Sequence, residues 1–194
     1  MNVQTLETVS EPILIDGLSW QDFKTVELLL DRPGVRLSFL RGELEVRKAL
    51  RKEHQTVKER IGALLNFYLL EIGIDYTPTG SVTLENESEQ VRREADKSYK
   101  LGANRPRPDL AIEVVVTSGG IDKLEAYKRL NISEVWFWQN SKLSIYGLRN
   151  RENDRVYEEM TKSEVLPELD IDLFVRCVNI PNHVQAIREF RQAI

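Results

Sequence analysis

The sequence predicts one domain of the α/β class built on a mixed β-sheet, and three observations predict it. An apolar segment, a short helical segment and a second apolar segment follow one another between residues 110 and 138. This is the order of a βαβ unit, whose strands are parallel neighbours. Alternating segments at residues 35–47 and 143–160 are typical of antiparallel pairs. A length of 194 residues and a hydrophobic content of 41% suit one domain with a substantial core.

The N-terminal segment predicts an arm followed by a helix. Residues 1–15 carry no strong pattern, and we expect a loose arm there. Ser19 followed by Asp22 is typical of a capping box, and the apolar stripe behind it predicts a helix that ends near residues 33–34 (Pro-Gly).

Two short strands, at residues 35–39 and 43–47, predict a hairpin that turns at residues 41–42. Glu43 and Glu45 alternate with apolar residues, so both carboxylates lie on one face of the hairpin. Such a face is more often exposed to solvent than part of a site, and we expect it to be exposed.

A long helix is predicted over residues 52–72, with Gly73 as its end. His54 lies in the first turn on the core-facing side. A hydrogen-bonded packing residue is the more common role for such a histidine, and a ligand or base is the alternative. The apolar stripe consists of His54, Val57, Ile61, Leu64, Leu65, Tyr68 and Ile72.

Weaker alternation predicts strands at residues 76–84 and 93–101, separated by a polar loop at residues 85–90. The second strand contains Asp96.

The central strand is predicted over residues 110–117, and Glu113 interrupts its apolar run. A buried carboxylate is costly unless a cation or a donor meets it. Two interpretations stay open. Glu113 either pairs with a neighbouring Arg or Lys for structural reasons, or belongs to a site with Lys123 of the following helix, predicted over residues 121–130.

The C-terminal part predicts strands and then helices, without an internal repeat, a linker or a low-complexity segment. We therefore expect a single domain over residues 1–194. The elements expected here are strands at residues 135–138, 143–148 and 155–160 and helices at residues 169–178 and 182–194.

Composition excludes several classes of protein. No apolar run approaches the roughly 20 residues that a membrane helix needs, and the N-terminus lacks a signal pattern. We therefore expect a cytoplasmic protein with no membrane partner. The lone Cys177 has an apolar context that predicts a packing thiol, and no Cys/His cluster has zinc spacing.

Charge is unevenly distributed along the chain. The net charge is −4, but residues 47–60 and residues 91–107 each carry +4. Such segregation can form a basic face on an acidic protein, which a polyanion would bind. Ordinary solvated segments are the alternative.

Taken in order, the elements between residues 52 and 139 run α, β, β, β, α, β, with Asp96 on the second strand and Glu113 on the third. This order and these acids resemble the PD-(D/E)XK nuclease superfamily, the restriction-endonuclease-like fold. Nearly the whole chain resembles the Uma family of restriction-endonuclease-like proteins, formerly a domain of unknown function. The segments that carry the resemblance are residues 41–46, 53–54, 80–83, 93–99, 108–114, 117–118, 122–127, 135–136 and 143–146.

The resemblance implies a metal-dependent endonuclease (a hydrolase) that cleaves phosphodiester bonds of DNA. Asp96 and Glu113 would be ligands of Mg²⁺ or Mn²⁺, and the Val114 carbonyl would complete the protein's share, because Mg²⁺ prefers oxygen ligands and keeps several waters. A lysine would orient or activate the attacking water.

The sequence departs from the family pattern at two positions. Ala95 stands where a proline would precede Asp96. Val115 stands where the superfamily places its lysine, two residues after Glu113. In similar family members the lysine moves to the following helix, which makes Lys123 the candidate here. An ordinary solvated lysine is the alternative.

Glu45, His54 and Asp109 also match family positions and are candidate accessory residues. Asp109 is four residues from Glu113, about 13 Å along a strand at roughly 3.3 Å per residue. It cannot share a metal ion with Glu113, so we interpret it as a residue that opens the strand or supports the site.

The expected partner is the phosphate backbone of DNA, and fold analogy favours a homodimer. Two alternatives remain. One is a nuclease-fold protein that binds nucleic acid without cutting it, motivated by Val115. The other is an oligomeric interaction module that uses exposed aromatics such as Trp136 and Trp138. The side chains expected to contact phosphates are Arg51, Lys52, Arg93 and Lys97.

Overall fold

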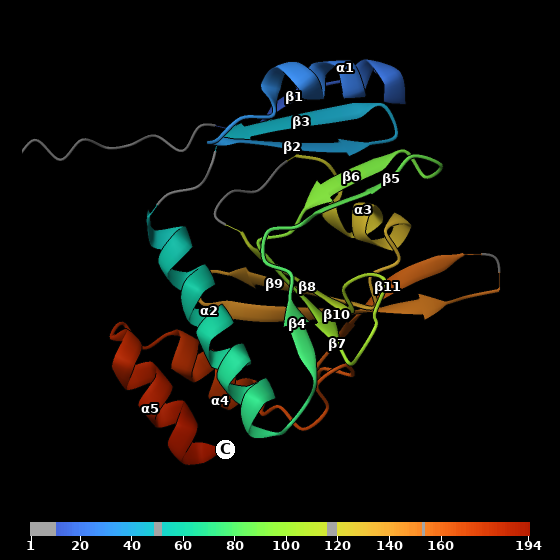
Figure 1. Cartoon of the computed structure of the whole chain (residues 1–194). Helices are drawn as coiled ribbons and strands as arrows, with labels where there is room; N and C mark the ends of the chain where they lie inside the picture. The colour runs from blue at the N-terminus through green and yellow to red at the C-terminus, as the bar shows by residue number, and fades with distance from the viewer. Residues whose placement is uncertain (1–10, 49–51, 116–119, 153) are drawn as a thin grey trace, which may run out of the picture.

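Two β-sheets, one above the other, frame the protein (Figure 1). The computed structural model describes residues 11–48, 52–115, 120–152 and 154–194. Helices cover the outer faces of both sheets, so the architecture is of the mixed α/β class that the sequence predicts.

The N-terminal sheet combines the first predicted hairpin with a second hairpin from later in the chain. Its strands lie in the order β1-β3-β2-β6-β5. The elements of this part are β1 (Ile13–Ile15), α1 (Trp20–Leu30), β2 (Val35–Leu40), β3 (Glu43–Lys48), β5 (Thr83–Asn86) and β6 (Val91–Glu94).

Helix α1 begins at the predicted capping box. The Ser19 hydroxyl accepts a hydrogen bond from the Asp22 backbone N–H at 3.1 Å, and the Asp22 carboxylate accepts one from the Ser19 backbone N–H at 3.0 Å. Phe23 of α1 stacks on Phe39 of β2 with ring centroids 4.7 Å apart, which attaches the helix to the sheet. The predicted loose arm is wrong for residues 13–15, because they pair with β3 as an edge strand.

The central sheet holds the predicted core. Its strands lie in the order β11-β10-β9-β8-β7-β4, with β8 and β9 parallel as predicted. The elements α2, β4, β7, β8, α3 and β9 have the predicted order αβββαβ. The bounds are α2 (Lys52–Glu71), β4 (Tyr76–Pro78), β7 (Lys97–Leu101), β8 (Leu110–Val114), α3 (Lys123–Arg129), β9 (Glu134–Gln139), β10 (Lys142–Asn150), β11 (Arg155–Met160), α4 (Ile171–Val178) and α5 (His183–Ala193).

The predicted strands at residues 76–84 and 93–101 are each divided between the two sheets. After Pro78 the chain leaves the central sheet, forms the β5–β6 hairpin beside β2, and returns at β7. Pro78 has no N–H with which to continue a ladder, and Gly80 has a φ of 60° that turns the chain. The predicted loop at residues 85–90 is therefore wrong at its start, which belongs to β5.

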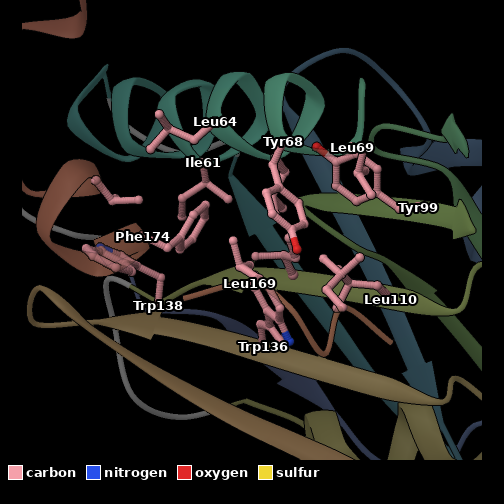
Figure 2. Close-up of a cluster of buried hydrophobic side chains, with 14 of the residues drawn as sticks. Ile61, Leu64, Tyr68, Leu69, Tyr99, Leu110, Trp136, Trp138, Leu169 and Phe174 are labelled. Carbon is pink, nitrogen blue, oxygen red and sulfur yellow. The ribbon is translucent and has the colours of Figure 1, made fainter. Parts of the chain in front are cut away.

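The largest core cluster lies between the central sheet and the layer formed by α2, α4 and α5 (Figure 2). Both faces of strand β8 are buried, since Leu110, Ile112 and Val114 belong to this cluster whereas Ala111 packs in the cluster with α3. Each large apolar side chain buried here stabilises the fold by roughly 1.5–3 kcal/mol. Cys177 is buried in the same cluster, which confirms the predicted packing thiol.

Trp136 and Trp138 lie inside this core, with 0% and 5% of their surface exposed. The prediction that they form an exposed oligomerisation surface is therefore wrong. The reason is that β9 lies inside the sheet, between β8 and β10, and that α4 covers one face of β9. Trp136 packs edge-on against Phe174 of α4, with 5.8 Å between the ring centroids.

Strand β8 ends at Val114. The predicted end of this strand, at residue 117, falls in residues 116–119, which lie outside the described residues.

Within the described part of the chain, no helix combines the length and the apolar character needed to span a membrane.

Candidate active site

A small pocket lies where the N-terminal sheet meets β8 and the start of α3. Its volume is about 30 Å³, room for a water molecule or an ion but not for a nucleotide. Asp96 and Glu113, the two predicted metal ligands, both line it. The charged side chains around it are Arg36, Glu45, Arg47, Lys48, Arg93, Glu94, Asp96, Glu113 and Lys123.

Asp96 occupies the kink between β6 and β7 rather than a position within a strand. Its Oδ2 accepts a hydrogen bond from the Val114 backbone N–H at 2.8 Å and lies 3.1 Å from His54 Nε2, while its Oδ1 accepts one from Arg36 Nη1 at 2.6 Å. Burial alone would raise the pKa of Asp96. The hydrogen bonds and positive charges outweigh burial and hold that pKa well below its usual range.

His54 joins α2 to the site. Its Nε2 lies 2.8 Å from the Val114 carbonyl oxygen, which can only accept, so Nε2 carries a hydrogen. The side chain is 2% exposed, and its Nδ1 has no hydrogen-bond partner among the described residues. The packing role favoured by the sequence and an accessory role beside Asp96 are both compatible with this position.

Glu113 is buried on the face of β8 that looks toward α3. Its Oε1 accepts hydrogen bonds from the Arg93 guanidinium, at 3.0 Å to both Nε and Nη2, and from the Tyr127 hydroxyl. Its Oε2 lies 3.5 Å from Lys123 Nζ. The two interpretations of Glu113 left open by the sequence therefore coincide: the carboxylate is paired with an arginine and also lines the pocket.

Lys123 is the first residue of α3, directly after the N-cap residue Asp122. Its side chain is 14% exposed, so the interpretation as an ordinary solvated lysine is wrong. Burial lowers the pKa of Lys123 and outweighs the opposing attraction of Glu113, and the positive charge of Arg93 lowers it further.

The polar face of the β2–β3 hairpin covers the pocket, and the prediction that it is exposed is wrong for Glu45. Ser38 lies opposite Glu45 and Arg36 opposite Arg47, so the four side chains share one face. Glu45 is 1% exposed, pairs with Arg47 at 2.8 Å, and its Oε2 accepts a hydrogen bond from the Ile121 backbone N–H at 3.1 Å. The face is polar because it contacts charged groups of the site, not because water covers it.

Asp109 lies away from the pocket. Its Oδ2 accepts a hydrogen bond from the Leu101 backbone N–H at 2.8 Å and lies 3.7 Å from Arg105 Nε. Asp109 thus stabilises the connection between β7 and β8, the supporting position that its spacing from Glu113 predicts.

Two of the four basic residues expected to contact DNA have described side chains. The Arg93 side chain is 5% exposed and bonded to a pocket carboxylate, and its contact with phosphates stays a prediction. Lys97 pairs with Glu59 at 2.8 Å and is 19% exposed. Arg51 and the side chain of Lys52 lie outside the described residues.

The sequence analysis missed Arg36, which lines the pocket, and Tyr127, whose hydroxyl donates a hydrogen bond to Glu113. In β2, Arg36 and Ser38 alternate with the apolar residues Leu37 and Phe39. This alternation puts Arg36 on the same polar face as Glu45 of β3, which is the sequence signal that could have identified it. Tyr127 is four residues after Lys123 on α3, a spacing that places both on one helix face.

The donor set suits a hard divalent cation with few protein ligands. Asp96, Glu113 and Val114 all line the pocket, and Mg²⁺ is commonly bound through one or two carboxylates with several waters. In the described ranges no three His, Cys, Asp or Glu side chains group closely enough to hold a metal by themselves. An ion here would therefore rely on the main-chain carbonyl and on water as well.

Comparison with protein families finds a match over most of the chain. The family model named Uma2, described as "Putative restriction endonuclease", matches residues 20–174. The match includes every strand of the two sheets except β1, and every residue that lines the pocket. No curated protein matches the chain.

Proposed function

The chain belongs to the Uma2 family, described as putative restriction endonucleases, and from this premise we propose that it is a metal-dependent nuclease that hydrolyses phosphodiester bonds of DNA. The reaction would take place at the pocket between the two sheets. The finer parts of the proposal, the ion and the DNA substrate, rest on the chemistry of the pocket residues.

One observation carries the proposal. Asp96 from the β6–β7 kink, Glu113 and Val114 from β8, and Lys123 from α3 line one pocket although they come from three separate segments. Two carboxylates, a carbonyl and an ammonium group are the set that hydrolysis of a phosphodiester needs at one place.

When bound, a divalent ion would supply a nucleophile by lowering the pKa of its water and would neutralise charge on the phosphate. Asp96, Glu113 and the Val114 carbonyl would hold it. Because His54 Nε2 contacts both the Asp96 carboxylate and the Val114 carbonyl, His54 would fix two of these three oxygens relative to each other.

Lys123 would act on the water and the phosphate. Its ammonium group lies beside Glu113 Oε2, where it can orient the attacking water and stabilise charge that develops on the phosphate. The lowered pKa also makes this ammonium a better proton donor than an ordinary lysine.

A plasmid-nicking assay with Mg²⁺ or Mn²⁺ tests the proposal. We expect the wild-type protein to nick supercoiled DNA, and we expect Asp96→Asn and Glu113→Gln each to reduce the rate by about 100-fold or more, because each removes a charged ligand while keeping the side-chain shape. Asp109→Asn is the matched control, since it changes an acid on the same segment outside the pocket. Unchanged rates in both pocket variants would remove the assigned site.

A second candidate function is a nuclease-fold protein that binds nucleic acid without cutting it. The observation that favours it is that the pocket acids already have cationic partners: Arg36 at Asp96, Arg93 at Glu113 and Arg47 at Glu45. Val115, which stands where the superfamily usually has its lysine, also favours a protein that does not cut. Calorimetry separates the two, because this candidate predicts salt-dependent DNA affinity without Mn²⁺ binding near millimolar concentrations.

We also propose a homodimer, by analogy with nucleases that cut two strands. Sedimentation equilibrium tests it: the expected mass is twice that of one chain, and a monomer at micromolar concentration would contradict it.

A further inference from the structure

Arg36 contacts Asp96 Oδ1, the carboxylate oxygen that Val114 and His54 do not hold. Asp96 Oδ2 is held by the Val114 backbone N–H and by buried His54, whereas Oδ1 accepts from Arg36 Nη1 at 2.6 Å. Arg36 also lies 3.5 Å from Glu94 through its Nε. The guanidinium therefore neutralises the carboxylate oxygen that a metal ion in the pocket would need.

Arg36, which contacts Asp96, is more exposed than the two cations that contact Glu113. Its side chain is 22% exposed, against 5% for Arg93 and 14% for Lys123. Arg93 is also held by Ser38 Oγ at 3.3 Å in addition to Glu113. Of the cations that hold the two pocket acids Asp96 and Glu113, Arg36 is therefore the one with the most room to move toward solvent.

A divalent ion and the guanidinium cannot both stay close to Asp96 Oδ1. Ligand oxygens lie about 2.0–2.1 Å from Mg²⁺, and in a pocket of about 30 Å³ the two positive groups would lie within a few ångströms of each other. Like charges at that separation repel strongly when they are shielded from water.

We propose that Arg36 is a resident counter-ion of Asp96, which a divalent metal ion must displace in order to bind. Without metal, Arg36 pairs with the buried carboxylate and stabilises it. When the ion binds, Arg36 moves away from Asp96, and the cost of breaking this pair lowers the affinity for the ion. The inference rests on the proposed function only in that Asp96 is taken as a metal ligand.

Titration calorimetry with Mn²⁺ alone tests the inference on the full chain. We expect Arg36→Gln to bind Mn²⁺ about tenfold more tightly than the wild type, as the loss of a partly buried ion pair would give. Arg149→Gln is the matched control, because Arg149 is also a partly exposed arginine paired with acids, on β10 and outside the pocket. It should bind Mn²⁺ like the wild type.

Thermal unfolding supplies a readout that does not depend on activity. Without metal, Arg36→Gln should melt at a lower temperature than the wild type, because Asp96 loses a partner. Its melting temperature should rise more on addition of Mn²⁺ than that of the wild type, because a ligand that binds more tightly stabilises the folded state more at the same concentration. Arg36→Lys, which keeps a positive charge, serves if the glutamine variant does not fold, and its affinity should fall between the two.

The outcomes separate this inference from the proposed function. Equal Mn²⁺ affinity in the wild type and in both Arg36 variants would overturn the inference. The proposed metal site would nevertheless hold if Asp96→Asn abolished Mn²⁺ binding in the same experiment. Mn²⁺ binding that survives Asp96→Asn would place the ion elsewhere and overturn both. Binding by Arg36→Gln where the wild type shows none would support the inference in its strongest form, and no binding by either would overturn it.

Discussion

We propose that the ammonium group of Lys123 takes the role of the lysine that is missing at position 115. Val115 and Lys123 line the same pocket, one from the end of β8 and one from the start of α3. Because the reaction requires a positive group near the phosphate and not a particular backbone position, the two positions should be interchangeable in part.

Substitution of Lys123 tests this equivalence. We expect Lys123→Met to lower the nicking rate by about 100-fold or more without lowering the free energy of unfolding, since it removes a buried charge and keeps the apolar stem. Val115→Lys in the Lys123→Met background should restore part of the activity. Lys128→Met is the control, because Lys128 lies on the same helix but pairs with Glu125 and Asp154 outside the pocket. Full activity in Lys123→Met would exclude a catalytic role.

The lowered pKa of Asp96 predicts sensitivity to acid. An ionised Asp96 stabilises the folded state fully above its unfolded pKa of about 3.8. This contribution is lost as the pH falls toward the still lower pKa of the folded state. The free energy of unfolding should therefore fall more steeply below about pH 4 in the wild type than in Asp96→Asn. Urea titrations at pH 7, 5, 4 and 3 check this, and parallel curves would show that the shift does not stabilise the fold.

At the scale of elements, the β2–β3 hairpin holds the start of α3 in place. Glu45 of β3 binds the Ile121 backbone N–H, and Gly120 lies so close that a Cβ atom there would come within 1.7 Å of Glu45 Oε2. Gly120 also has a φ of 97°, which favours glycine. Lys123 follows three residues later, so this contact positions it over Glu113.

Two glycine substitutions isolate that contact. Gly34→Ala should cost about 1 kcal/mol of unfolding free energy, because Gly34 has a φ of 88° but nothing within 4 Å of the added Cβ. Gly120→Ala should cost at least about 2 kcal/mol, because it adds overpacking against Glu45 to the same backbone cost. Urea denaturation measures both, and equal losses would show that the Glu45 contact is not tight. The nicking rate should fall only in Gly120→Ala.

At the scale of the whole molecule, the last helix belongs to the core although the family match ends at residue 174. Phe190 of α5 is 0% exposed and its ring centroid lies 6.1 Å from that of Phe174 of α4 and 6.5 Å from that of Tyr68 of α2. Buried Arg60 of α2 donates to the Val178 carbonyl at 2.8 Å, at the end of α4. The helices behind the central sheet thus form one packed layer (Figure 1).

A pair of substitutions on α5 measures this contribution. Phe190→Ala should lower the free energy of unfolding by about 3–5 kcal/mol, because it leaves a cavity among aromatic rings. Val184→Ala on the same helix should change it by less than about 0.5 kcal/mol, because Val184 is 55% exposed. A small effect of Phe190→Ala would show that α5 folds separately from the layer.

Element types were predictable to the extent that each depends on local periodicity. The capping box of α1 follows from spacing within one segment and is confirmed. The stripe of α2 follows from spacing as well and is confirmed except at Ile72, which lies beyond the helix and is 42% exposed. The division of residues 76–101 between two sheets was not predictable, because a period of two is the same whichever sheet a strand joins. Residues 91–94 and residues 97–101 belong to different sheets only because β6 pairs with β2 whereas β7 pairs with β8.

By itself, the sequence determined the order αβββαβ, the buried position of Glu113 on β8, and the presence of Asp96 and Lys123 on neighbouring segments. The tertiary structure alone decided which charges meet. Arg36 reaches Asp96 across 60 residues and His54 reaches Val114 across another 60, and local patterns contain no information on contacts at that separation. The polar hairpin face could belong to solvent or to a site on sequence grounds, and it became part of the site only when the two sheets packed together.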